Sequence, residues 1–287
     1  MAELRRAWEV AEDSGFEWLS VWDHFYPIPG PLDADCFEAV ACHAAMAVST
    51  LRIRLGCLVY SAGYRHPAVL ANVGATIDHL SDGRLEMGIG AGWHQPEYEA
   101  YGLPFEPPAV RLRRMAETIE IVRLLWTQDA TDYKGEFFQL KGARCNPKPV
   151  QQPPRIWVGA VGERRALTLA GQLGDGWNAA FVSPQDFARK LAIAKEAAPN
   201  PNRLVTGVNL MFLPGPDSDA AEAVRRRFGP GAQAFQSGAL VGSTHAMADR
   251  VAEYVAAGAD LVILAVRAPF ALDELAAFAA DVVPEFT

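Results

Sequence analysis

The sequence predicts an α/β fold in which one (β/α)8 TIM-like barrel uses the whole chain, residues 1–287. Three observations support this prediction. Short apolar runs alternate with amphipathic runs, which is the pattern of βα units in a parallel sheet. The length of 287 residues suits a single barrel. Half of the residues are hydrophobic and 21% are charged, as in a globular protein with a large core.

The short apolar runs predict seven strands, at residues 16–22, 51–60, 85–89, 155–160, 176–181, 203–213 and 260–266. A complete barrel has eight, and the chain opens with a helix that should follow a strand. We therefore expect the first strand of the barrel to be missing.

Helix signals lie between these strands. Leu4, Trp8 and Ala11 recur on one face of the first helix, and Ser14 with Gly15 ends it. Pro67 suits the first position of another helix. The same patterns predict helices at 35–48, 67–82, 112–126, 163–173, 184–198, 244–257 and 272–283.

Two segments break the alternation. Residues 90–154 contain one strong helix, a hairpin-like stretch at 133–140 and many Pro, Gly and aromatic residues, so they predict a long insertion at one mouth of the barrel. Residues 214–242 are irregular. We expect neither segment to form a second domain.

Charge and cysteine content limit the function classes. The formal net charge of −8 argues against a nucleic-acid or anionic-membrane partner. Four cysteines without CxxC spacing indicate a reduced, cytoplasmic protein. No uncharged run is long enough to span a membrane. We expect a small-molecule substrate and a homodimer.

Chemistry in such barrels lies where strands end. His24 follows the first predicted strand and can exchange a proton near neutral pH, with Asp23 beside it. A histidine bonded to loop backbone is the alternative. Metal hydrolysis fits poorly because no strand carries His-x-His. A glycosidase needs two facing carboxylates, for which Asp23 and Glu97 are possible but isolated candidates. We expect no metal.

Two glycine-rich turns follow strands. Residues 88–92 are not a GxGxxG motif and no helix follows directly, so they favour a surface on which a flat ring lies, or a tight turn. Residues 159–162 precede a helix, where backbone N–H groups bind phosphate, unless this is an ordinary βα turn. Aromatic residues near the same mouth suit a planar cofactor and an apolar substrate, although at least two should be core residues. The predicted substrate pocket is Trp22, Phe25, Tyr60, Trp93 and Trp177.

Ordered motifs extend over essentially the whole chain. They are Val21–Phe25, Tyr64–Ala68, Asp78–Arg84, Gly88–Trp93 with Glu97, Pro154–Gly159 and Gly174–Asn178. Together they resemble the luciferase-like monooxygenase superfamily, and most of all its F420-dependent oxidoreductases. The resemblance implies a barrel of the bacterial luciferase type that binds coenzyme F420, or alternatively FMN, at its C-terminal mouth.

The resemblance also implies roles for single residues. Asp23 and His24 would face the reactive edge of the ring and be catalytic. A non-prolyl cis peptide, expected at Leu58–Val59, would back the ring. The implied cofactor-binding residues are Leu58, Val59, Ser61, Ala91, Gly92, Gly159, Ala160, Val161 and Gly162. F420 sugar-phosphate dehydrogenases carry a catalytic Glu where this chain has Trp93, so sugar oxidation is disfavoured.

The function that follows is hydride transfer between F420 and an unidentified organic substrate. One alternative is a two-component monooxygenase that uses FMNH2 from a separate reductase. The other is a cofactor-binding paralogue without turnover. A glutamate tail on F420 would require Arg or Lys at the rim of the cavity, whereas FMN would require only the phosphate loop.

Overall fold

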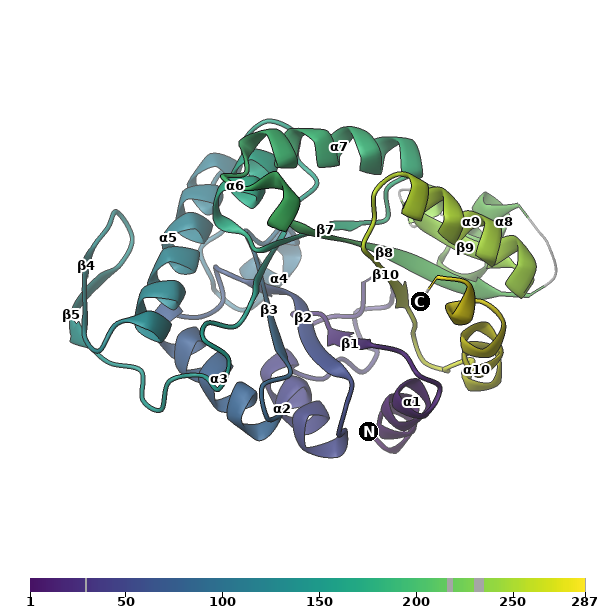
Figure 1. Cartoon of the computed structure of the whole chain (residues 1–287), viewed down its shortest axis with the longest axis horizontal. Coiled ribbons are helices and arrows are strands. Elements are labelled where there is room, and N and C mark those ends of the chain that lie inside the picture. Colours follow the sequence, from purple (N-terminus) through teal and green to yellow (C-terminus); the bar gives the residue numbers. More distant parts are fainter. Residues whose placement is uncertain (29, 216–218, 230–234, 287) are drawn as a thin grey trace.

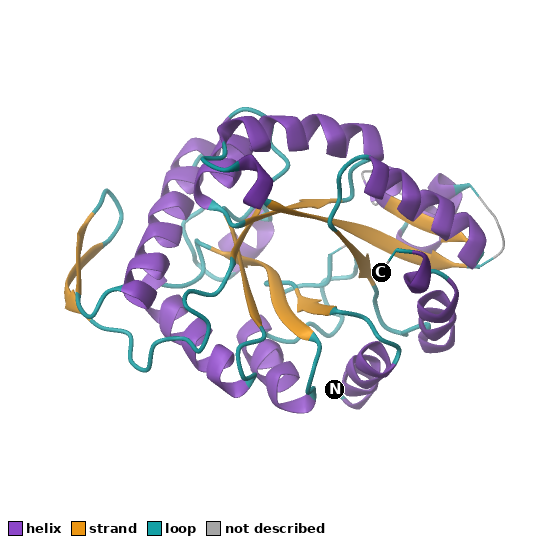
Figure 2. Ribbon diagram, in the orientation of Figure 1, coloured by secondary structure: helices purple, strands orange, loops and turns teal. Residues whose placement is uncertain are grey.

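The computed structural model describes residues 1–28, 30–215, 219–229 and 235–286. Seven parallel strands curl into one sheet with helices on its outer face (Figure 1, Figure 2). In the order of the sheet these strands are β1 (Trp18–Val21), β2 (Arg54–Ser61), β3 (Leu85–Gly90), β6 (Ile156–Gly159), β7 (Gly176–Ala180), β8 (Val205–Pro214) and β10 (Leu261–Ala265). All seven predicted strands are confirmed, with ends that differ by a few residues.

The sheet does not close into a complete barrel. Within the described residues, β1 pairs with β2, and β10 pairs with β8, but β1 and β10 do not pair with each other. Every residue of β3 is buried, whereas every residue of β1 and β10 is only partly buried. We call the opening between β1 and β10 the seam.

Helices cover the outside of the sheet. The predicted ones are confirmed as α1 (Ala2–Asp13), α2 (Ala39–Ser49), α3 (Pro67–Leu80), α5 (Pro108–Thr127), α6 (Arg165–Leu173), α7 (Pro184–Ala197), α9 (Thr244–Ala256) and α10 (Leu272–Asp281). Helices α1 and α10 contact each other although they lie at opposite ends of the chain (Figure 1). None of the described helices is both long and apolar enough to cross a membrane.

The two segments that break the alternation contain further elements. The insertion holds α4 (Gln95–Ala100), α5 and a hairpin of β4 (Thr131–Lys134) and β5 (Gln139–Ala143), which projects beyond α5 (Figure 1). The segment predicted as irregular contains α8 (Ala220–Phe228) and β9 (Ala239–Gly242), which pairs with the end of β8. The 3-10 turns include η1 (Pro201–Arg203) and η3 (Val283–Glu285). Residues 216–218 and 230–234 lie outside the described part.

A charged cluster lies at the N-terminal end of the strands. The carboxylate of Glu86 is fully buried, accepts hydrogen bonds from Arg54 (2.5 Å) and the Trp157 indole (2.6 Å), and pairs with Arg155 (3.2 Å). A buried carboxylate without these donors would be strongly destabilising. The cluster therefore stabilises this end of the sheet, and the opposite end is left for chemistry.

The fully buried His43 of α2 gives a pH-dependent stability. Its Nδ1 lies 2.8 Å from the Tyr60 hydroxyl, and burial lowers its pKa from 6.5 to about 4. The unfolded chain therefore binds a proton at His43 below pH 6.5, whereas the folded chain binds it only below about pH 4. We expect His43 to reduce the free energy of unfolding by about 3 kcal/mol between these values as pH falls.

Urea unfolding at several pH values between 7 and 4 measures this effect. His43→Gln should flatten the pH dependence over this window, whereas the exposed His245→Gln should not. Equal slopes for the wild type and His43→Gln would contradict the prediction.

Candidate active site

His24 and Glu97 form a hydrogen-bonded pair at the C-terminal ends of the strands. His24 follows β1, and Glu97 comes from α4 in the insertion. The Nδ1 atom of His24 lies 2.7 Å from the Glu97 carboxylate. A carboxylate accepts hydrogen bonds, so the proton of the neutral ring is placed on Nδ1. The Nε2 atom is then free to accept a proton from a bound molecule.

Glu97 is held rigidly. Its Oε1 accepts the backbone amides of Phe25 (2.5 Å) and Tyr26 (2.9 Å), and its Oε2 accepts the Tyr64 hydroxyl (2.9 Å) as well as His24. Burial alone would raise its pKa, but the hydrogen bonds from His24, Tyr26 and Tyr64 outweigh burial and lower the pKa to about 2. Glu97 is therefore an anion at neutral pH that fixes the loop carrying His24.

Asp23 faces a different set of partners. Its buried carboxylate accepts two hydrogen bonds from Arg65 (2.6 and 2.9 Å) and one from the Ser61 amide (2.9 Å). Arg65 also pairs with Glu38, at 2.5 Å. These contacts tie the end of β1 to the end of β2. They account for both carboxylate oxygens of Asp23 within the protein.

Three neighbouring strands bring the predicted cofactor-binding residues together. Leu58, Val59 and Ser61 lie on β2, Ala91 and Gly92 follow β3, and residues 159–162 follow β6. The Leu58–Val59 peptide is cis, as expected.

The Val59 side chain leans against glycine backbone on β3 and on β6. A Cβ on Gly159 would approach it to 2.8 Å, and the nearest neighbour of a Cβ on Gly90 would also be Val59. A larger residue at either position would displace Val59. The glycines therefore keep the surface around Val59 flat. We call this surface the Val59 wall.

The turn that follows β6 is also available for a ligand. Within the described residues, the backbone amides of Val161, Gly162 and Glu163 donate to no protein group. Lys190 of α7 holds the loop by donating to the Val161 carbonyl (2.7 Å), and it pairs with Glu163 together with Arg189. Free amides directly before a helix form a favourable phosphate site.

Three of the five predicted pocket aromatics lie at the mouth. Trp22 lines the large cavity described below, Trp93 is exposed and lies edge-on to the His24 ring at 5.9 Å, and Phe25 stacks on Tyr64 at 4.6 Å. The other two belong to the core instead, and both are fully buried. Tyr60 bonds His43 of α2, and the Trp177 indole donates to the Ala160 carbonyl (2.9 Å). Their predicted pocket role is therefore wrong, because both side chains point toward the helices.

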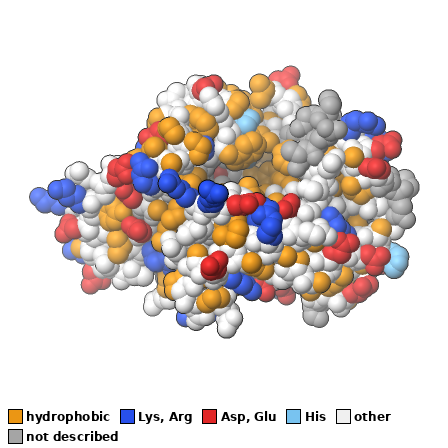
Figure 3. Space-filling model, turned by 90° about the horizontal axis from the view of Figure 1, so that it is seen from above, with side chains coloured by type: hydrophobic (Ala, Val, Ile, Leu, Met, Phe, Trp, Pro, Cys, Tyr) orange, Lys and Arg blue, Asp and Glu red, His pale blue; other side chains and the backbone are white. Residues whose placement is uncertain are grey.

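A cavity of about 630 Å³ runs along the seam and reaches the mouth. Its lining includes Trp22, His24, Tyr26, Cys36 and Arg267, but none of the predicted cofactor-binding residues. His24 therefore borders this cavity, whereas Val59 does not. Figure 3 shows that one face of the molecule is hollowed, with mainly hydrophobic side chains in the hollow and charged ones along its rim.

No role for Glu97 was predicted from the sequence. The available signal was its place in the motif that begins at Gly88, three residues after His94. His94, His24 and Glu97 bring potential metal ligands within 4.8 Å of one another. Both carboxylate oxygens of Glu97 already accept hydrogen bonds from the protein. The absence of a metal from this site stays a prediction.

Residues 1–235 match the family model for luciferase-like monooxygenases, and the chain belongs to this family. Its fold agrees with that of an F420-dependent secondary alcohol dehydrogenase, with a TM-score of 0.86 at 21% identity over 100% of this chain and 95% of that one.

Three curated relatives are enzymes of different kinds: a reductase, a dehydrogenase and a monooxygenase. The chain is 35% identical over 194 residues to 5,10-methylenetetrahydromethanopterin reductase of Archaeoglobus fulgidus, covering 68% of this chain and 52% of the relative. It is 33% identical over 168 residues to F420-dependent glucose-6-phosphate dehydrogenase of Amycolatopsis mediterranei (58% and 50%). It is 28% identical over 222 residues to FMNH(2)-dependent dimethylsulfone monooxygenase of Pseudomonas putida (77% and 60%). The chain thus spans about half the length of the first two. The names of the second and third relatives give F420 and FMNH(2) as their cofactors, and both belong to a flavin-like class.

Proposed function

We propose that this chain is an F420-dependent oxidoreductase that transfers a hydride between the deazaflavin and an organic substrate. The observation that carries the proposal is the His24–Glu97 pair, which leaves Nε2 of His24 without a described partner at the edge of the large cavity. The F420-dependent relatives support this choice of cofactor.

The residues present fit a flat ring with a phosphate tail. The glycine-flanked wall at Val59 would lie against the ring, and the amides of Val161, Gly162 and Glu163 would hold the phosphate. Arg189 and Lys190 neutralise the Glu163 carboxylate, which would otherwise repel a phosphate. F420, when bound, supplies the carbon that donates or accepts the hydride.

The protein contributes proton handling and positioning. His24 would take or give the proton of the substrate at Nε2, because Glu97 holds the ring by Nδ1. Glu97 stabilises the imidazolium that forms when His24 accepts a proton. The bonds of Asp23 to Arg65 favour a positioning role for Asp23 over proton transfer.

A monooxygenase that uses FMNH2 is the second candidate. The relative from Pseudomonas putida favours it, since it matches the largest share of this chain among the three relatives compared. FMN would need the phosphate loop and the ring wall but no further cationic site.

Titration of the purified protein with F420 and with FMN, followed by fluorescence, tests the proposal. We expect saturable quenching of F420. Gly162→Val should weaken that binding by about 1–3 kcal/mol, because the side chain blocks the approach of the phosphate to the loop amides. A Cβ on Gly162 would lie 3.6 Å from the Ala166 side chain, so the variant has room to fold.

The melting temperature of Gly162→Val is the control for folding. Micromolar binding of FMN with no saturable binding of F420 would replace the proposal with the monooxygenase. Unchanged F420 affinity in a folded Gly162→Val variant would place the phosphate elsewhere.

A further inference from the structure

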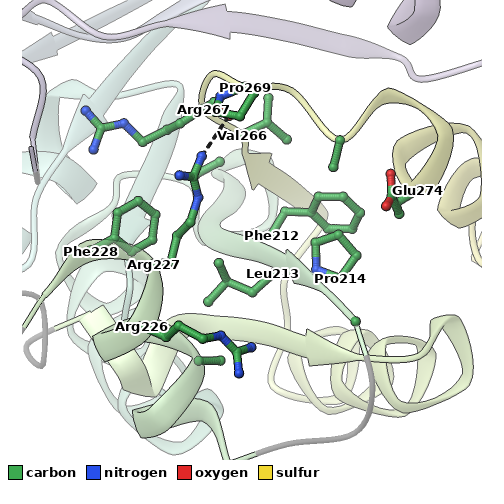
Figure 4. A pocket seen from close by; sticks show the side chains of 14 residues that line it. Phe212, Leu213, Pro214, Arg226, Arg227, Phe228, Val266, Arg267, Pro269 and Glu274 are labelled. Atoms are coloured by element: carbon green, nitrogen blue, oxygen red, sulfur yellow. Dashed lines mark hydrogen bonds between the residues drawn. The ribbon is translucent and has the colours of Figure 1, made fainter. Parts of the chain in front are cut away.

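A second cavity, of about 280 Å³, lies at the C-terminal ends of β8 and β10 (Figure 4). Three arginines line it, Arg226 and Arg227 from the last turn of α8 and Arg267 from the loop after β10. We call it the arginine pocket. It shares Ala265, Val266 and Arg267 with the large cavity that reaches His24, so the two cavities adjoin.

The positive charge of the arginine pocket is not neutralised by the described part of the protein. None of its three arginines forms an ion pair with a described carboxylate. The one acidic residue in the lining, Glu274, lies on the far side of Phe212 and Pro214 from the arginines (Figure 4). A cluster of arginines without a counter-charge among the described residues is unexpected in a chain with a net charge of −8.

Two of the arginines are packed against the same ring. The guanidinium carbons of Arg227 and Arg267 lie 5.7 and 5.8 Å from the centre of the Phe228 ring. Burial and the nearby charge of Arg227 both lower the pKa of Arg267. A bound anion would relieve the repulsion between these two like charges.

Arg267 also connects the arginine pocket to the reacting end of the site. Its guanidinium lies 3.4 Å from where a Cβ on Gly30 would be, in the loop that follows His24. It lines the large cavity together with Cys36, whose thiol donates to the carbonyl of His24 at 3.3 Å. In the sheet, β7 and β8 separate the strand that precedes the phosphate loop from β10. The arginine pocket is therefore distinct from the cofactor phosphate site.

We propose that the arginine pocket binds a carboxylate or phosphate group of the organic substrate, with Arg267 as its main ligand. This rests on the proposed function. It implies that the substrate is an anion whose reacting carbon lies in the large cavity near His24, while its charged end reaches Arg267. A planar guanidinium fork recognises either kind of oxyanion.

The helix dipole and hydrogen bonds to backbone carbonyls account for the positions of only some of these arginines. Basic residues in the last turn of α8 interact favourably with the helix dipole, and Arg227 donates to the carbonyls of Arg267 (3.4 Å) and Ala268 (3.0 Å). Arg267 lies on no helix, and no hydrogen bond from its side chain to a described residue explains its position. It is therefore the residue to test, with Arg225 of α8, which does not line the pocket, as the matched control.

Inorganic phosphate is the probe, added to protein that carries Gly162→Val so that the phosphate loop does not contribute. Binding is followed by calorimetry. We expect saturable binding that Arg267→Gln weakens by about tenfold, the effect of losing one charge-assisted hydrogen bond. Arg225→Gln should leave it unchanged. No saturable binding, or equal affinity in all variants, would overturn the proposal.

A second titration identifies the source of the anion. F420 affinity should be the same for the wild type and Arg267→Gln if the anion belongs to the substrate. A tenfold loss of F420 affinity in Arg267→Gln would overturn the substrate assignment. It would show that the arginines bind the acidic tail of the cofactor instead. If the wild type does not bind F420 while phosphate binding still depends on Arg267, the proposed cofactor fails and the anion site stands.

Discussion

His24→Ala should lower turnover by about 10²–10⁴-fold, the usual contribution of a positioned general acid or base. The side chain lies at the mouth with Nδ1 committed to Glu97, so its removal takes away a group placed to exchange a proton at Nε2. Cofactor affinity should change little, because the ring wall and the phosphate loop come from other strands. Single-turnover kinetics and cofactor titration on the same variant measure both effects.

The control is His245→Ala, which replaces an exposed histidine on α9. It should leave turnover and melting temperature unchanged. A His24→Ala variant that melts at a lower temperature but turns over normally per folded molecule would show that His24 is structural.

Glu97→Gln should cost about 10²-fold in turnover. The amide keeps the shape of the side chain, but it presents either a donor or a neutral acceptor to His24 Nδ1, so the tautomer is less well fixed and the imidazolium loses its counter-charge. The rate should therefore depend on pH differently in the variant. The pH–rate profile of the variant, compared with the wild type, measures this difference.

The same variant should lose stability at neutral pH. The pKa of Glu97 is lowered from 4.5 to about 2 in the folded chain, so its contribution of about 3 kcal/mol is present above pH 4.5 and is lost as the pH falls toward 2. Glu99→Gln, an exposed change on the same helix, is the control. A Glu97→Gln variant with an unchanged pH–rate profile would contradict the assignment.

Periodicity predicted the elements that are long or strongly patterned. Apolar patterns predicted a strand at 203–213 and a helix around Met115 and Trp126. The structure has β8 and α5 at these places. Elements inside the two segments that break the alternation were not all predicted. The six residues of α4 and four of β9 are too few to show a period, and β9 is defined by its pairing with β8.

The sequence predicted those site residues whose position is determined by the end of a strand. His24 and residues 159–162 follow strands, so sheet topology alone places them at the mouth. Glu97 lies 73 residues from His24 along the chain and meets it through the insertion, which no local pattern indicates. Tyr60 and Trp177 show the reverse error, since alternation along a strand turns every second side chain toward the helices.

The seam has a consequence for how copies of this chain meet. Strands β1 and β10 each present one row of backbone N–H and C=O groups that pairs with no described strand. Such a row is a template on which any extended polypeptide can add by main-chain hydrogen bonds, whatever its side chains. At high concentration, self-association should therefore start at this opening rather than on the helical exterior, and short peptides that form a parallel strand should suppress it by occupying the same groups.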